Sequence, residues 1–221
     1  MVAAGERCDL RVLIGHTSRG RFVLYRLHLR RYCDPMATET ALIDADAYLA
    51  RGETERREEL IGGRIFVSTP TGLHQVVALR IGAALEAWTS SAAGRGRASL
   101  PVDLRLTDLD VLAPDLLWWA DPKRFDLHAP ANTELPDLVV EIRSPSTWVR
   151  DIGVKRRLYE DHGVGELWLV DPLAPAVLAY RRSRRDAPVF DVEIELGMQD
   201  SLTSPAMPGL DIAVGALLHT D

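Results

Sequence analysis

The sequence predicts an α/β protein with a mixed β-sheet flanked by helices. Two observations carry this prediction. Helical and strand patterns alternate along the chain, which is typical of α/β architectures rather than of bundles or sandwiches. In addition, the run Leu138–Ile142 is almost continuously apolar, as expected of a central strand that is covered on both faces. The chain has 221 residues, of which 47% are hydrophobic, and this is enough for one domain core.

Residues 1–35 differ in composition from the rest of the chain. They contain both cysteines, and seven arginines against three acidic residues. Because the stretch from Met36 resembles an ordinary protein start, we expect residues 1–35 to be an N-terminal extension added by a mis-assigned start, and residues 36–221 to form the folded domain. The alternative is a real N-terminal hairpin, since Arg21–Leu29 alternates as a strand does.

Composition also excludes several classes of protein. No apolar run is long enough to span a membrane, and the N-terminus lacks the apolar segment of a secretory signal, so we expect a soluble, cytoplasmic protein. Cys8 and Cys33 are too few for a disulfide framework or a zinc site. The net charge of −6 argues against a broad basic surface, so any contact with nucleic acid must use a local groove.

The first expected elements are short, and a long helix follows them. Residues 43–50 predict a short helix. Glu58–Ser68 holds two apolar runs joined by Gly62 and Gly63, a pair that tolerates the positive φ angles of tight turns, and it therefore predicts a β-hairpin. From Thr71 to about Ser90, apolar residues recur at spacings of three and four, which predicts a helix packed on one face.

Strands dominate the remainder of the chain. A proline-rich, polar stretch over Asp121–Pro136 predicts a loop, and Gly163 ends a second predicted helix. In chain order we expect strands at Leu100–Leu106, Asp115–Trp119 and Leu138–Ile142, the helix at Asp151–His162, strands at Glu166–Val170, Val177–Arg182 and Val189–Leu196, and a segment over Leu202–Leu218 that wraps the edge of the core.

Two acidic residues fall where buried strands are predicted. Glu141 lies within the apolar run, where an unpaired carboxylate is costly, so a divalent metal or a hydrogen-bonded cation must compensate it unless it points to solvent at the end of the strand. Asp115 opens the preceding strand, and such a residue alone is more often a strand start or a turn. If both acids converge on one edge of the sheet, their oxygens suit Mg²⁺ and leave coordination sites for water and phosphate.

Lys155 is one of only two lysines in the chain. In the second predicted helix it shares one face with Ile152, Leu158, Tyr159 and His162. A lysine on such a face either packs its stem on the core with a solvated tip or finds a carboxylate. Near a metal-bound water and a scissile phosphate, its ammonium would position the nucleophile and stabilise developing negative charge.

Several stretches together resemble one family. They are Arg57–Arg64, His74–Val77, Ala113–Leu117, Pro136–Thr147, Arg150–Tyr159, Gly163–Pro172 and Ser204–Leu210. In their order and spacing they resemble the Uma-two endonuclease family of the PD-(D/E)XK restriction-endonuclease-like superfamily, over about Thr40–Leu218. The resemblance implies a restriction-endonuclease-like core, a mixed β-sheet flanked by helices, that hydrolyses DNA phosphodiester bonds with Mg²⁺ or Mn²⁺.

The resemblance also implies roles for individual residues. Asp115 and Glu141 would bind the metal, and Lys155 would be the catalytic lysine. Glu59 would add an acid that holds metal or water, although the glutamate before it could be mistaken for it. The superfamily's lysine usually lies two residues after the acid on the same strand. This chain has Arg143 there, so the lysine would have moved to the helix.

Candidate substrate contacts surround these residues. Ser144 and Ser146 precede the second predicted helix, where they either bind a phosphate or simply cap the helix. Local arginines are further candidates, namely Arg143, Arg150, Arg156 and Arg157. His74 opens the long helix at a position where the family often has a histidine. The competing hypothesis is a non-catalytic binding or regulatory module that keeps the nuclease-like fold, for example as a homodimer.

Overall fold

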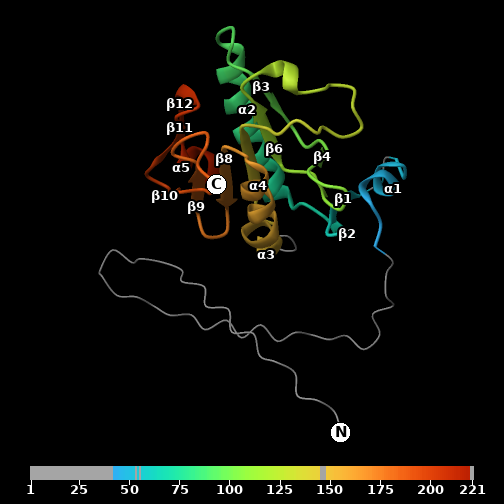
Figure 1. Ribbon diagram of the computed structural model, residues 1–221. Helices are drawn as coiled ribbons and strands as arrows, with labels where there is room; N and C mark the ends of the chain where they lie inside the picture. Colours follow the sequence, from blue (N-terminus) through green and yellow to red (C-terminus); the bar gives the residue numbers. More distant parts are fainter. Residues whose placement is uncertain (1–41, 53, 55, 145–147, 220–221) are drawn as a thin grey trace. The chain divides into compact units, whose positions relative to one another are not determined.

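The computed structural model describes residues 42–52, 54, 56–144 and 148–219 (Figure 1). The expected N-terminal extension over residues 1–35, its alternative hairpin and Ser146 lie outside the described residues. Within them, helices and strands alternate and the larger sheet is mixed, which confirms the predicted α/β class. No helix in these ranges is both long enough and apolar enough to cross a membrane.

The larger sheet has six strands in the order β10-β9-β8-β7-β6-β3. It is mixed because β7 and β8 run parallel, whereas the other neighbouring pairs are antiparallel. A parallel pair needs a crossover, and the helical segment over residues 148–162 provides it. The strands are β3 (Arg97–Ser99), β6 (Leu116–Trp119), β7 (Leu138–Ile142), β8 (Glu166–Asp171), β9 (Ala176–Arg181) and β10 (Val192–Gly197).

β7 lies at the centre of the core. Each of its residues is buried, as the apolar run predicts. Alternate side chains project to opposite faces of the sheet. Val140 packs with Ile81 and Leu85 on one face, whereas Val139 packs with Tyr159 on the other.

Helices cover both faces of this sheet (Figure 1). On one face lies α2 (Gly72–Ser90), which begins after Thr71, whose side chain accepts a hydrogen bond from the His74 backbone N–H. On the other face lies α4 (Arg156–His162), which ends at Gly163 in the left-handed region with φ of 92°. The predicted arrangement of a mixed sheet flanked by helices is therefore confirmed.

A second sheet of four strands carries the predicted hairpin. Its order is β2-β1-β5-β4, with β1 at Arg57–Ile61, β2 at Arg64–Ser68, β4 at Leu104–Arg105 and β5 at Val111–Leu112. Gly62 and Gly63 connect β1 and β2 with φ of 56° and 72°, as the turn requires. The short helix α1 (Ala45–Leu49) packs against this sheet through Ala45 and Tyr48.

The prediction of a single strand over Leu100–Leu106 is wrong. The structure divides this region between β3, which ends at Ser99 in the larger sheet, and β4, which begins at Leu104 in the smaller sheet. Pro101 lies between them and has no N–H to donate to a strand ladder. The chain passes from one sheet to the other at this point.

The C-terminal segment, which was expected to wrap the edge of the core, packs on the α2 side of it. β11 (Ser201–Ser204) and β12 (Met207–Ala213) form a hairpin, and α5 (Val214–Leu218) follows it. Leu202 and Ile212 belong to the same buried cluster as the inner face of α2.

The second helix contains a π-helical turn that the sequence pattern does not predict. It runs as α3 (Trp148–Arg150), the π-helical turn η2 (Asp151–Lys155) and then α4. A π turn closes i to i+5 hydrogen bonds, so it is wider than an α turn and changes which side chains share a face. The buried residues are Asp151, Lys155 and Tyr159, whereas Ile152, which was expected on the same face, is 38% exposed.

Candidate active site

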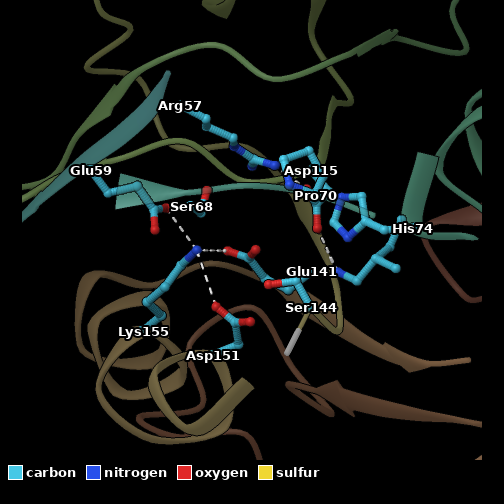
Figure 2. A pocket seen from close by; sticks show the side chains of 11 residues that line it. Arg57, Glu59, Ser68, Pro70, His74, Asp115, Glu141, Ser144, Asp151 and Lys155 are labelled. Carbon is cyan, nitrogen blue, oxygen red and sulfur yellow. Dashed lines mark hydrogen bonds and ion pairs between the residues drawn. The ribbon is translucent and has the colours of Figure 1, made fainter. Parts of the chain in front are cut away.

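The two acids expected to bind a metal lie together where β6 begins and the antiparallel β7 ends. Asp115 directly precedes β6, and its backbone N–H donates to the Val140 carbonyl oxygen at 3.1 Å. The Ile142 N–H in turn donates to Asp115 Oδ2 at 2.6 Å. These bonds fix Asp115 next to β7, and both Asp115 and Glu141 line the same small pocket (Figure 2). The structure thus brings the two acids together.

Lys155 lies among carboxylates in this pocket. Its Nζ lies 2.6 Å from Glu141 Oε1, 2.7 Å from Glu59 Oε1 and 3.4 Å from Asp151 Oδ1. Dashed lines mark these three contacts in Figure 2. Because its side chain is only 2% exposed, Lys155 does not have the solvated tip that was the alternative. Glu59 also accepts the Ala113 N–H at 3.0 Å, so it is this glutamate that faces the pocket.

Tyr159 provides a further contact to Glu141. Its hydroxyl donates to Glu141 Oε1 at 2.5 Å, and the whole side chain is buried. Asp151, Lys155 and Tyr159 follow one another at intervals of four residues on the buried side of the crossover. Sequence analysis missed Asp151 and Tyr159 as members of the site, although their regular spacing around Lys155 was a visible signal.

Arg57 and His74 hold Asp115 through one of its oxygens. The Arg57 guanidinium donates to Asp115 Oδ1 and to the Ala113 carbonyl oxygen. His74 Nε2 lies 3.0 Å from the same Asp115 oxygen, and His74 is buried in the first turn of α2. His74 was expected near the site, whereas Arg57 was missed as a contact of Asp115.

The pocket buries more carboxylates than cations. Among its described lining residues, four carboxylates face the two permanently charged groups of Arg57 and Lys155. Burial raises the pKa of Glu141 to about 8; Lys155 opposes this shift, whereas Asp151 and the other acids add to it. Burial alone would lower the pKa of Lys155, but the neighbouring carboxylates outweigh burial and raise that pKa above its ordinary value. Lys155 therefore stays protonated.

Asp115 shifts in the opposite direction to Glu141. Burial alone would raise its pKa, but the hydrogen bond from His74 and the charge of Arg57 lower that pKa to about 2. Near neutral pH Asp115 is therefore ionised, whereas Glu141 retains a proton. Adjacent carboxyl groups whose pKa values are driven apart in this way are typical of functional sites.

A comparison with protein families decides which family the chain comes from. The model of the Uma2 family, described as a putative restriction endonuclease, matches residues 45–215. The chain belongs to the Uma2 family. The match includes every residue that lines the pocket of this Uma2 protein, and it confirms the resemblance seen in the sequence.

A solved structure supports the fold of the Uma2 protein. The crystal structure of a putative nuclease belonging to DUF820, from Anabaena variabilis ATCC 29413, matches it with a TM-score of 0.67 and 21% sequence identity. The match covers 80% of this chain and 97% of that chain. It confirms the expected nuclease-like α/β core. No curated protein matches the chain.

The expected substrate contacts of the Uma2 protein lie only partly at the pocket. Ser144 is buried and lines it. Arg143 instead forms an ion pair of 2.6 Å with Asp171. The Arg156 guanidinium lies 4.6 Å from the centre of the Tyr180 ring. The structure therefore does not bring Arg143 or Arg156 into the pocket, because an acid and an aromatic ring elsewhere hold them.

The chemistry of the Uma2 pocket fits a hard divalent cation. Among the residues described between 42 and 219, no group of three or more His, Cys, Asp or Glu side chains is arranged to hold a metal ion, and Lys155 lies between three of the carboxylates. Nevertheless, Asp115 and Glu141 offer carboxylate oxygens, the ligands that Mg²⁺ and Mn²⁺ prefer. The lining holds two more carboxylates than permanent cations. Once Glu141 loses its proton, one divalent ion would neutralise this excess.

Proposed function

We propose that this protein is an endonuclease that hydrolyses phosphodiester bonds in DNA with Mg²⁺ or Mn²⁺. The observation that carries the proposal is the buried pocket in which Asp115, Glu141 and Lys155 converge with an excess of negative charge. Membership of the Uma2 family supports the same reaction class, because the family is described as a putative restriction endonuclease.

Asp115 and Glu141 are the proposed metal ligands. A bound divalent ion would supply a water of lowered pKa and a positive charge beside the phosphate. Arg57 and His74 restrain Asp115, and the Tyr159 hydroxyl restrains Glu141. Both carboxylates are therefore oriented before a ligand arrives, which lowers the cost of reorganisation during the reaction.

Lys155 would act through its positive charge. Because the surrounding carboxylates raise its pKa, it keeps its proton and is not suited to act as a general base. Its ammonium would orient the attacking water and stabilise the charge that develops on the phosphate oxygens. Glu59 and Asp151 restrain the ammonium, because they contact the same Nζ atom that Glu141 contacts.

DNA would have to reach the pocket despite the acidity of the protein. The net charge of −6 does not attract a polyanion over long distances, so the proposed contacts with DNA are local. A cytoplasmic location, where such a protein would meet DNA, is part of this proposal. The homodimer stays a prediction from the sequence.

A second candidate is a non-catalytic binding or regulatory module that keeps the nuclease-like fold. One observation favours it: both proposed metal ligands already contact cations of the chain, Asp115 through Arg57 and Glu141 through Lys155. In such a module these ion pairs would serve to specify the fold alone.

Metal binding separates the two candidates without knowledge of a DNA sequence. Mn²⁺ is titrated by calorimetry into the full-length chain, into Glu141→Gln and into Glu166→Gln. Glu166 is a matched control, because it is also a buried glutamate of the larger sheet but does not line the pocket. The proposal predicts saturable binding in the parent and in E166Q, and loss of binding in E141Q.

Nicking of supercoiled plasmid DNA in Mn²⁺ tests the chemistry itself. The parent should convert supercoiled to open-circular DNA, and Lys155→Met should slow this conversion by about 100-fold or more, the usual effect of removing a group that stabilises developing charge. A parent that neither binds Mn²⁺ in the presence of a phosphodiester nor nicks the plasmid would favour the non-catalytic module.

A further inference from the structure

Phe66 lies on the pocket side of the β1–β2 hairpin. It is paired directly opposite Glu59, and residues directly opposite each other in an antiparallel pair project from the same face. From that face Glu59 contacts Lys155, and Ser68, two residues beyond Phe66, lines the pocket. The Phe66 ring therefore lies beside the pocket.

Arg150 rests on this ring. The central carbon of its guanidinium is 4.8 Å from the centre of the Phe66 ring, a distance at which cation–π attraction stabilises the contact. Arg150 directly precedes Asp151, which lines the pocket. The guanidinium is thus held at the rim, between the β1–β2 hairpin and the crossover helix.

Among the residues that the structure describes, Arg150 has no acidic partner, in contrast to neighbouring arginines. Arg57 pairs with Asp115, and Arg143 pairs with Asp171. For Arg150, no carboxylate of the described chain lies within ion-pairing distance, and its interaction is with the Phe66 ring. The Nε atoms of Arg57, Arg143 and Arg150 are all buried without a hydrogen-bond partner in the described chain. Of these three arginines, Arg57 and Arg143 each pair with a carboxylate, whereas Arg150 does not.

The surface beside Arg150 is open to a large partner. Val149 is 77% exposed and Val154 is 40% exposed. A guanidinium presents paired N–H donors whose geometry matches the oxygens of a phosphate, and stacking on an aromatic ring leaves those edges available. A phosphate approaching the pocket from this side would find a positioned cation.

We infer that Arg150, supported by Phe66, binds a phosphate of the DNA strand next to the phosphate that is hydrolysed. This inference rests on the proposed function and adds a substrate contact to it. The role is in binding rather than in chemistry, because Arg150 does not belong to the pocket lining where the reacting groups converge.

The salt dependence of DNA binding tests this inference. Affinity of the full-length protein for a labelled DNA duplex is measured with Ca²⁺ in place of Mn²⁺, between about 50 and 200 mM KCl. Loss of one phosphate contact in Arg150→Ala should reduce the slope of log K against log salt by about 0.9 and weaken binding about tenfold near 0.1 M salt. Phe66→Leu, which keeps the charge but removes the ring, should weaken binding less.

Arg95→Ala is the matched control. Its guanidinium also lies over an aromatic ring, 4.7 Å from the centre of Trp88, but it follows the end of α2 remote from His74. This variant should keep the parental affinity and slope. The Mn²⁺ titration should be the same in R150A as in the parent.

The outcomes distinguish the inference from the function on which it rests. If the parent binds DNA and R150A keeps its affinity and slope, the inference is overturned and the proposed function stands. If R150A also loses Mn²⁺ binding, Arg150 supports the fold of the pocket and the inference is again overturned. A parent that binds no DNA and nicks no plasmid overturns the proposed function, and the inference with it.

Discussion

Nζ of Lys155 lies 2.6 Å from Oε1 of Glu141, and neither side chain is more than 3% exposed. One continuous segment supplies both residues, because the crossover that carries Lys155 follows directly from the strand of Glu141. Further carboxylates surround the pair, so the charge of each partner depends on the other. A mutation of either residue, a change of pH or the binding of a metal should therefore change the charge of both groups.

Lys155→Met should destabilise the protein in a way that metal reverses. The variant removes the cation that contacts Glu59, Glu141 and Asp151 and leaves their charges buried, so its free energy of unfolding should fall by about 3–5 kcal/mol in EDTA at alkaline pH. Mn²⁺ should restore much of the lost stability, because its positive charge would neutralise these buried carboxylates. Urea denaturation with EDTA and with Mn²⁺ measures both effects, and a variant as stable as its parent in EDTA would contradict the prediction.

Stability of the metal-free protein should fall as the pH rises from about 5 to 8. The pKa of Glu141 is about 8 in the folded protein against an ordinary value of 4.5, so in this window the folded state holds a proton that the unfolded state releases. Urea denaturation in EDTA across this range measures the slope. Glu141→Gln should flatten it, and an equally steep slope in that variant would assign the effect to another group.

Asp115→Asn should destabilise the protein although it removes a buried negative charge. Arg57 and His74 hold the ionised form, since the pKa of Asp115 is about 2 against an ordinary 3.8, and its stabilising effect is present above pH 3.8 and lost as the pH falls toward 2. At neutral pH we expect a loss of about 1–3 kcal/mol, together with loss of Mn²⁺ binding.

Asp110→Asn provides the control for this variant. Asp110 is also buried and accepts hydrogen bonds from Gly62 and Thr107, but it does not line the pocket. It should therefore keep Mn²⁺ binding in calorimetry. An Asp115→Asn protein more stable than the parent in denaturation would show that repulsion between the carboxylates outweighs the contact with Arg57.

Tyr159→Phe should move metal binding to higher pH. The tyrosine hydroxyl donates to Glu141, which favours the ionised carboxylate, so its removal should raise the pKa of Glu141 further. At neutral pH the affinity for Mn²⁺ should fall about tenfold, equivalent to one hydrogen bond to a charged group, and the difference should shrink at alkaline pH. Tyr180→Phe, which alters a hydroxyl outside the pocket, should leave the titration curves unchanged.

The parts of the fold that local pattern determines could be predicted from the sequence. The turn at Gly62 and Gly63, the helix over Thr71–Ser90 and the buried strand Leu138–Ile142 all depend on residues close in the chain, and the structure contains each of them. The strand over Leu100–Leu106 failed because the residues on the two sides of Pro101 join different sheets. That division is a long-range property with only the proline as a local sign.

The site could be predicted where a charged residue interrupts an apolar context, as Glu141 and Lys155 do. Arg57 could not be identified in this way, because arginines are common in the chain and its partner Asp115 is 58 residues away. Tyr159 looked like an ordinary core aromatic. Its spacing of four residues from Lys155 was the one signal, whereas the π turn that accompanies the burial of Asp151 has no local sign in the sequence.

The contacts of Lys155 also connect the two sheets. Glu59 belongs to β1 of the four-stranded sheet and Glu141 to β7 of the six-stranded sheet, and the ammonium bridges them. Neither sheet alone carries the complete set of charges. A nascent or partly unfolded chain in which the sheets have not associated would therefore lack the proposed activity, and the appearance of that activity during refolding would mark the association of the two sheets.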